Sequence, residues 1–397
     1  MLTNLAQQPA DALLALIKLF NDDPRPEKID LGVGVYRTDN GATPVFAAIK
    51  AAERKLVETQ DSKAYLGPEG DMGFVEALKP YVFGRESAPV AAGRIDGMQA
   101  PGGTGALRLA FSVAQRAGAK AFIMGNPSWP NHPQMFAELG IPLKAFNHAA
   151  ADGTADMPAL REAIAAGQPG DAILLHGCCH NPTGIDYTPA EWDEIAALIA
   201  EKGLLPILDL AYQGLGKGME EDAYGVRRVL DAVPEALVAY SCDKNFGLYR
   251  DRVGALYVMM AEAAQLKAVM SNAYALARTA WSQPPDHGAA AVRLVLADAV
   301  LTRQWLDELD TMRDRMRQVR DVLAKAGHVG GVDLTPIGGQ NGLFSIIPFT
   351  PAHVAAMRAE HGIYFAGSGR INVAGLTMGN IRTFIDAVAA VTGKVEA

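Results

Sequence analysis

The sequence predicts an α/β protein whose central sheet is largely parallel, and two observations carry this prediction. Short apolar runs of strand length recur along the chain, and amphipathic segments with helix signals lie between several of them. Strands that alternate with helices indicate parallel strands joined by helical crossovers, and in such sheets the functional residues lie beyond the carboxyl ends of the strands. The apolar runs are "AFIM" at 121–124, "AILLH" at 172–176, "LPILDL" at 205–210, "ALVAY" at 236–240 and "ALYVMM" at 255–260.

The segment "TPAEWDEIAALIAEKG" at 188–203 shows how the helices are specified. Thr188 is suited to cap the helix, Pro189 fits the first helical position, and Glu191 completes a capping box. Apolar residues then recur on one stripe, and Gly203 ends the pattern. The sequence therefore predicts a helix with both ends defined.

Near residue 310 the alternating apolar runs give way to a long charged segment, which predicts a second, smaller α+β domain. The segment 300–327 is charged, free of proline and predicted to be one long helix, and after it come short apolar runs and another helix near 351–361. The first forty-odd residues are expected to pack with this C-terminal part. The predicted division is a large domain at 44–310 and a small domain at 1–43 and 311–397.

Composition excludes several classes of function. The chain has 397 residues, 49% hydrophobic and 20% charged, as expected for a soluble globular enzyme. The net charge is −8 with no basic block, which argues against binding of nucleic acid or an anionic membrane surface. The apolar run "DALLALIKLF" at 11–20 is too short and too charged to span a membrane, and predicts an amphipathic helix on the protein's own surface or at a subunit contact.

The cysteines indicate a reducing compartment. Cys178 and Cys179 are adjacent and Cys242 is the third, so they do not form a disulfide framework. No second Cys/His pair has ligand spacing, so no metal is expected, and buried small side chains are the favoured interpretation. Reduced cysteines fit the cytoplasm.

The loops that follow the predicted strands hold polar residues with more than one interpretation. Gly102, Gly103 and Thr104 open a helix and offer an anion site, or form a tight turn with a threonine cap. Trp129 either stacks on a flat ligand or belongs to the core. Asn181 precedes a proline, and either points its amide into a cleft or forms a turn.

Asp209 interrupts an apolar strand, and a buried carboxylate needs a cation or strong donors. The partner is a protonated pyridine nitrogen or a structural salt bridge. Tyr212, three residues later, is placed to donate to a phenolate-like oxygen. His176 and His180 are interpreted as hydrogen-bonded supporting residues rather than ligands.

The stretch "SCDKNFGLYRDRVG" at 241–254 adds a nucleophile. Lys244 forms Schiff bases with carbonyls once its pKa is lowered. Arg252 and Ser241 offer donors to a phosphate. By themselves these are ordinary loop cations, but the combined set matches the needs of pyridoxal phosphate. Arg278 and Arg370 are suited to hold two carboxylates of a dicarboxylic amino acid, although exposed arginines are also common.

Eight segments, in order along nearly the whole chain, resemble the class I pyridoxal-phosphate aminotransferases, within them the aspartate and aromatic-amino-acid branch. The resemblance implies fold type I: a large cofactor-binding domain with a mostly parallel sheet and helices on both faces, and a smaller α+β domain. The segments are "LGVGVYRTDNGATPV", "YLGPEG", "PGGTGALR", "NPSWPNH", "HGCCHNPTGID", "DLAYQGLGKGMEEDAYGVR", "KNFGLYRDRVG" and "SGRINVAGL".

The resemblance implies a role for each matching residue. Lys244 looks like the Schiff-base lysine and proton shuttle, Asp209 like the partner of the ring nitrogen, and Asn181 and Tyr212 like donors to the ring oxygen. Trp129 would stack on the ring. The phosphate would be held by Gly102, Gly103, Thr104, Ser241 and Arg252, with Tyr65 from the neighbouring subunit of a homodimer. Gly34 would lie beside the substrate, Arg370 would bind its α-carboxylate, and Arg278 of the neighbour would meet a distal carboxylate.

Departures from the family pattern concern the phosphate site and the pocket rim. Asp243 stands where the pattern has serine, and would repel a phosphate unless it points away or pairs with Arg250 or Arg252. Ala64 and Gln283 stand where asparagines are common in aspartate enzymes. The segments "GKGMEEDAYGVR" and "ARTAWSQPPDHG" lean towards aromatic members, so the pocket rim is expected to be less tuned to short dicarboxylates.

The expected activity is amino-group transfer from aspartate, tyrosine or phenylalanine to 2-oxoglutarate by a ping-pong mechanism. Two alternatives stay open at this point. One is a β-lyase reaction on the same scaffold, which Arg278 disfavours. The other is a cofactor-binding protein with impaired catalysis, which Asp243 keeps open.

Overall fold

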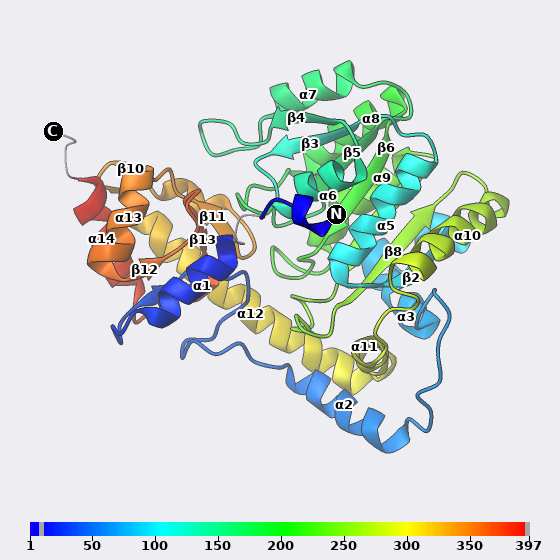
Figure 1. Ribbon diagram of the computed structural model, residues 1–397, viewed down its shortest axis with the longest axis horizontal. Helices are drawn as coiled ribbons and strands as arrows, with labels where there is room; N and C mark the ends of the chain where they lie inside the picture. The colour runs from blue at the N-terminus through cyan, green and yellow to red at the C-terminus, as the bar shows by residue number, and fades with distance from the viewer. Residues whose placement is uncertain (8–11, 394–397) are drawn as a thin grey trace. The chain divides into compact units, whose positions relative to one another are not determined.

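The computed structural model describes residues 1–7 and 12–393 (Figure 1). The chain divides into two compact units, Pro44–Asp314 (the larger unit) and Met1–Thr43 with Arg315–Ala397 (the smaller unit). The predicted functional division at residue 310 stays a prediction, because compactness alone does not test it. Within the described ranges, no helix combines the length and the apolar character that crossing a membrane requires.

The larger unit is built on a seven-stranded sheet of order β2-β8-β7-β6-β5-β3-β4. β8 runs antiparallel to its neighbours β2 and β7, and the other neighbouring strands pair in parallel. The predicted mostly parallel sheet is therefore confirmed. Its strands are β2 (Ile95–Pro101), β3 (Phe122–Asn126), β4 (Leu143–Asn147), β5 (Ala172–His176), β6 (Leu205–Leu210), β7 (Ala236–Ser241) and β8 (Val253–Met259).

Helices cover both faces of this sheet, as Figure 1 shows. Leu256 and Val258 of β8 belong to a core that includes apolar side chains of α5 and α10. Tyr257 lies between them in sequence and points to the opposite face, where its hydroxyl donates to the Val75 carbonyl of α3 (2.8 Å). The helices that begin in this unit are α2 (Ala47–Thr59), α3 (Met72–Phe83), α4 (Ala88–Ala91), α5 (Gly102–Arg116), α6 (Asn131–Leu139), α7 (Met157–Ala166), α8 (Pro189–Lys202), α9 (Tyr224–Ala232), α10 (Ala263–Ala280), α11 (His287–Ala297) and α12 (Ala299–Ala326).

The five apolar runs form β3, β5, β6, β7 and β8, and the predicted helix at 188–203 is α8. Its capping box is formed as expected, because the Glu191 N–H donates to Thr188 Oγ1 and the Thr188 N–H donates to Glu191 Oε2. Two strands of the seven-stranded sheet were not predicted from the sequence. β2 is interrupted by polar residues and a glycine, and β4 is a largely exposed strand at the end of the sheet, so neither has a continuous apolar run.

The smaller unit consists of short strand pairs and helices. β1 pairs with β12 in parallel, while β9 with β10 and β11 with β13 are antiparallel. The predicted N-terminal helix is present from residue 12, and Asp11, its first predicted residue, lies outside the described ranges. The elements are α1 (Ala12–Asp22), β1 (Ile29–Asp30), β9 (His328–Val329), β10 (Val332–Asp333), β11 (Phe344–Ile346), α13 (Pro351–His361), β12 (Ile363–Tyr364), β13 (Arg370–Asn372) and α14 (Ile381–Thr392).

A buried arginine organises the core of the smaller unit. Arg320 on α12 is only 1% exposed, and its guanidinium donates to the Gly342 carbonyl (2.7 Å), the Phe344 carbonyl (2.8 Å) and Ser345 Oγ (2.8 Å). Phe344 and Ser345 belong to β11, and Gly342 lies two residues before it. Because a buried carbonyl without a donor is costly, the position of this segment depends on the arginine.

We expect Arg320→Met to lower the free energy of unfolding by about 3 kcal/mol, because several buried carbonyls lose a charged donor. Urea denaturation followed by circular dichroism measures this change. Arg382→Met is the matched control, since Arg382 lies in the same unit with a side chain that is 80% exposed. Equal shifts of the urea midpoint in the two variants would contradict a structural role for Arg320.

Candidate active site

The sheet brings the predicted site residues of the larger unit to one edge. β3, β5, β6 and β7 run in parallel, so the segments that follow them, with Trp129, Asn181, Tyr212 and Lys244, leave the sheet at the same end. β8 is antiparallel, so the residue before it, Arg252, lies at that end too. The reversed direction of one strand therefore adds an arginine to an edge that otherwise receives the carboxyl ends of strands.

Gly102, Gly103, Ser241 and Arg252 form a tight group that we call the anion cup. A Cβ atom on Gly103 would lie 2.9 Å from Ser241 Cβ, and one on Gly102 would lie 2.5 Å from Arg252 Nη2. Gly102 also has φ of 70°, in the left-handed region that favours glycine. α5 begins at Gly102 and is preceded by Pro101, whose side chain has no hydrogen-bonding group. The alternative of a threonine cap is therefore wrong, and Thr104 lies inside the first turn. Amide N–H groups at a helix start favour an anion.

Asp243 pairs with Arg252 of the cup through Oδ2 and Nη1, which is one of the arrangements that the sequence left open. Nη1 also donates to the Tyr249 carbonyl (3.0 Å). Asp243 is 5% exposed, and its other oxygen, Oδ1, is buried without a hydrogen-bond partner among the described residues. Arg252 itself has φ of 57°, in the left-handed region, and a residue that is not glycine is held there only when its surroundings demand it.

Lys244 lies beside the aromatic ring of Tyr212, with Nζ 5.0 Å from the ring centre. Burial lowers the pKa of its amine, and the negative charges of Asp243 and Asp209 oppose that shift without cancelling it. A larger share of the amine is therefore neutral near pH 7 than in an exposed lysine, and the neutral amine is the form that acts as nucleophile or base.

Asp209 is buried at the end of β6, where His132 Nε2 lies 3.2 Å from its Oδ2. Burial is the largest single effect and raises the pKa of the Asp209 carboxyl, but the hydrogen bond from His132, together with the charges of His132, His176 and Lys244, brings the pKa below its usual value. The side chain thus stays a carboxylate and keeps a negative charge at the edge of the sheet. The sequence allowed two kinds of partner for Asp209, a protonated pyridine nitrogen or a structural salt bridge. Within the protein, the partner of the carboxylate is the imidazole of His132.

A series of hydrogen bonds links the Asn181 backbone to Asp209, and in each bond the donor lies on the Asn181 side. The Asn181 backbone N–H donates to His176 Nδ1 (3.4 Å), so His176 carries its proton on Nε2, which donates to Ser128 Oγ (3.1 Å). The Ser128 hydroxyl then donates to His132 Nδ1 (2.9 Å), which leaves the Nε2 proton of His132 for Asp209. Burial, with a smaller contribution from His132, lowers the pKa of His176 to about 3, consistent with this neutral tautomer.

His180 and His148 extend this polar group. The two rings stack with centres 3.6 Å apart, and His180 Nδ1 lies 2.9 Å from Thr183 Oγ1. His148 Nε2 donates to the Ile185 carbonyl (2.9 Å), and burial lowers the pKa of His148 to about 4. The expected supporting role of the histidines is thus seen in contacts, but Ser128, His132 and His148 were missed. The signal for the first two was their spacing of four residues around the start of a helix.

Asn181 and Tyr212 lie next to one another, with Asn181 Nδ2 3.5 Å from the tyrosine hydroxyl. Asn181 Oδ1 is buried and has no partner in the described part of the chain. Trp129 is half-buried, packs against the core and meets the His132 ring edge-on at 5.1 Å. Trp129 thus makes the core contacts that one alternative expects, and its role in stacking on a flat ligand stays a prediction.

Four predicted residues lie outside this group. Gly34 and Arg370 belong to the smaller unit, where Arg370 Nη2 donates to the Gly32 carbonyl (3.0 Å) and a Cβ on Gly34 would lie 2.8 Å from Phe344 Cζ. Tyr65 is 92% exposed, and Arg278 is exposed at the end of α10.

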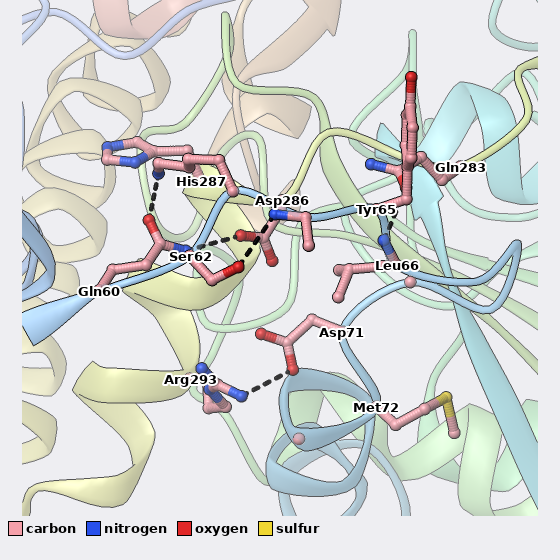
Figure 2. A pocket seen from close by; sticks show the side chains of 14 residues that line it. Gln60, Ser62, Tyr65, Leu66, Asp71, Met72, Gln283, Asp286, His287 and Arg293 are labelled. Atoms are coloured by element: carbon pink, nitrogen blue, oxygen red, sulfur yellow. Dashed lines mark hydrogen bonds and ion pairs between the residues drawn. The ribbon is translucent and has the colours of Figure 1, made fainter.

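Tyr65 lines a separate pocket at the surface of the larger unit. Figure 2 shows its side chain pointing away from the ion pair of Asp71 with Arg293, while the following Leu66 N–H donates to Gln283 Oε1 (2.8 Å). Gln283, one of the departures noted in the sequence, therefore holds the backbone of the segment that presents Tyr65.

Comparison with known proteins agrees with this geometry. The family model described as aminotransferase class I and II matches residues 26–388. The chain is 49% identical to a tyrosine aminotransferase of Rhizobium meliloti (strain 1021), over 94% of this chain and 95% of the relative. It is 41% identical to the aspartate aminotransferase of Escherichia coli (strain K12), over 98% and 100%.

Among solved structures, the aromatic-amino-acid aminotransferase from Burkholderia pseudomallei, covalently bound to pyridoxal phosphate, is similar with a TM-score of 0.95 and 36% identity, over 99% of each chain. Both the sequence and the fold thus match over nearly the full length. The chain belongs to the class I and II aminotransferases.

Proposed function

We propose that this aminotransferase moves the amino group of aspartate, tyrosine or phenylalanine to 2-oxoglutarate, with pyridoxal 5′-phosphate as cofactor and ping-pong kinetics. The observation that carries the proposal is the convergence of a buried amine, a buried carboxylate and an anion cup at one edge of the sheet. Lys244, Asp209 and Arg252 supply these three groups.

The residues present fit this cofactor. The anion cup, with Thr104, is suited to the phosphate, and the ionised Asp209 to a protonated ring nitrogen. The Asn181 side-chain nitrogen and the Tyr212 hydroxyl, which lie next to one another, supply donors for the ring oxygen. Trp129 offers its ring for stacking. When bound, the cofactor draws electrons away from the substrate Cα, so that a proton can leave that carbon.

Lys244 is the base in this proposal. Its Nζ takes the proton from the substrate Cα and would return it to the cofactor carbon that carries the substrate nitrogen. The lowered pKa keeps the amine available for that transfer. Asp209 keeps the ring nitrogen protonated because its own pKa is low and His132 holds its orientation. Tyr212 lies against Lys244 and limits where the amine can move.

Two arginines are proposed to bind substrate carboxylates. In the smaller unit, Arg370 is fixed by Gly32, and Asn372 Nδ2 donates to the carbonyls of Val33 (2.6 Å) and Val35 (2.7 Å). The loop that contains Gly34 is therefore held beside Arg370, which supports a joint role at the α-carboxylate. Arg278 is assigned to the distal carboxylate of aspartate, glutamate or 2-oxoglutarate.

We further propose a homodimer with shared sites in the cytoplasm. Tyr65 and Arg278 are exposed on their own chain, so they are available to the site of a partner subunit. The cytoplasmic location is supported by three buried free thiols. Initial rates with aspartate, tyrosine and phenylalanine against 2-oxoglutarate test the activity. Absence of 2-oxo acid formation from all three would refute it.

We expect Lys244→Ala to reduce turnover by more than about 10⁴-fold, because the variant loses the group that moves the proton. Borohydride treatment of the purified protein, followed by peptide mass analysis, should attach the cofactor to residue 244 in the wild type only. Lys217→Ala is the matched control, since Lys217 is an exposed lysine of the same unit and should leave both readouts unchanged. Full activity of Lys244→Ala would end the mechanism.

Arg278→Ala should lower kcat/KM for aspartate by about 10²-fold or more and change that for phenylalanine little, because only aspartate has a distal carboxylate to leave unpaired. Steady-state rates at a saturating concentration of 2-oxoglutarate, established for each variant, give kcat/KM for aspartate and for phenylalanine. Lys267→Ala removes an exposed cation from the same helix and serves as control. Equal losses for the two amino acids would refute the assignment.

A further inference from the structure

Resting on the proposed function, we propose that the phosphate of the cofactor binds in the anion cup together with one proton, which it shares with the carboxylate of Asp243. Phosphate binding at this site is then coupled to proton uptake. Asp243 acts as a positioning residue that selects the singly charged, protonated form of the phosphate over the doubly charged form.

The first support is the position of the carboxylate. Asp243 lies two residues after Ser241, the last residue of β7 and part of the cup. Its Oδ2 accepts a hydrogen bond from Arg252 Nη1. The other terminal nitrogen, Nη2, is the one that lies close to Gly102. One guanidinium therefore contacts both the carboxylate and the start of α5, where amide N–H groups favour an anion.

The second support is the unsatisfied oxygen. Oδ1 of Asp243 is buried and lacks a donor among the described residues, although the residue is only 5% exposed. A buried carboxylate oxygen without a donor is costly. A phosphate hydroxyl supplies the missing donor, whereas a fully ionised phosphate offers acceptors alone.

The backbone that carries this carboxylate is also held in place. The Asp243 N–H donates to Ser241 Oγ (3.2 Å), and the preceding Cys242 N–H donates to the Val253 carbonyl at the start of β8 (2.9 Å). Cys242 and Asn245 on either side are fully buried. An incoming phosphate thus meets a negative group whose backbone is held by the same strands that build the cup.

A shared proton would remove the repulsion between two anions at this place. Arg252 pairs with Asp243, and the negative charges of Asp243 and Asp209 both act on the amine of Lys244. The negative charge of Asp243 raises the pKa of the adjacent Cys242 thiol, after the larger effect of burial, so this thiol stays neutral. Two full anions beside one guanidinium repel each other, and a proton between them removes one charge.

The proton balance follows from the chemistry of phosphate esters, whose second pKa is about 6. Above about pH 7 the free ligand is a dianion, so the complex gains one proton from solvent, held between a phosphate oxygen and Asp243. The dissociation constant then rises by about tenfold for each pH unit above 7 through this proton alone. Below about pH 6 the free phosphate already carries the proton and the dependence disappears.

The test uses the full chain freed of cofactor and titrated with pyridoxine 5′-phosphate, which has no aldehyde to react with Lys244. Between pH 7 and 8.5, each pH unit should raise the dissociation constant of the wild type by about ten times the factor seen for Asp243→Asn or Asp243→Ser, because one more proton is bound. Asp251→Asn removes a carboxylate from the same loop and should keep the wild-type slope. Pyridoxine without phosphate should show no difference in slope between variants.

A second readout is the ³¹P resonance of the intact holoenzyme at pH 8. The wild type should give the shift of a phosphate monoanion, and Asp243→Ser that of a dianion. Equal slopes and a dianion signal in all proteins would overturn the inference while leaving the proposed cofactor in place. Failure of the wild type to bind pyridoxine 5′-phosphate at any pH would instead refute the proposed function.

Discussion

A buried carboxylate at the end of β6 is the constraint around which the larger unit is arranged. Asp209 must remain ionised in surroundings that disfavour charge, and the hydrogen bond from His132 is the largest of several contributions that make this possible. His132 can donate in that direction only because Ser128 and His176 fix its tautomer. The same sequence of hydrogen bonds ends at the backbone of Asn181, so the residues proposed to hold two sides of the cofactor ring are oriented together.

Strand direction explains why the anion cup lies beside this carboxylate. β8 is hydrogen-bonded between β2 and β7, with Pro101 opposite Val253 and Ser241 opposite Gly254. The start of α5, the end of β7 and the residue before β8 therefore meet in one place. A Cβ on Gly254 would lie 2.6 Å from the Gly102 backbone, which shows how closely the chains approach there. The cup is thus a consequence of the pairing of three neighbouring strands.

The charges near Lys244 are balanced rather than simply positive. Burial favours the neutral amine, while Asp209 and Asp243 favour the charged one, and burial prevails. Asp243 therefore acts on two groups at once, since it neighbours the amine in sequence and pairs with the arginine of the cup. A serine at this position would do neither, so the substitution changes the electrostatics of the whole edge and not the phosphate site alone.

The sequence by itself determined the local structure and the identity of most candidate residues. Five strands and the capped helix α8 could be predicted because apolar periodicity and capping involve neighbours a few positions apart. Asp209 and Lys244 stood out as charged residues beside apolar runs. Tertiary structure alone decided the contacts between distant segments: Ser128 and His176 are 48 positions apart, and His132 and Asp209 are 77 apart. Such pairs depend on strand order and direction, which no local pattern encodes, so the histidine contacts and the choice of Arg252 as the partner of Asp243 emerged only from the folded chain.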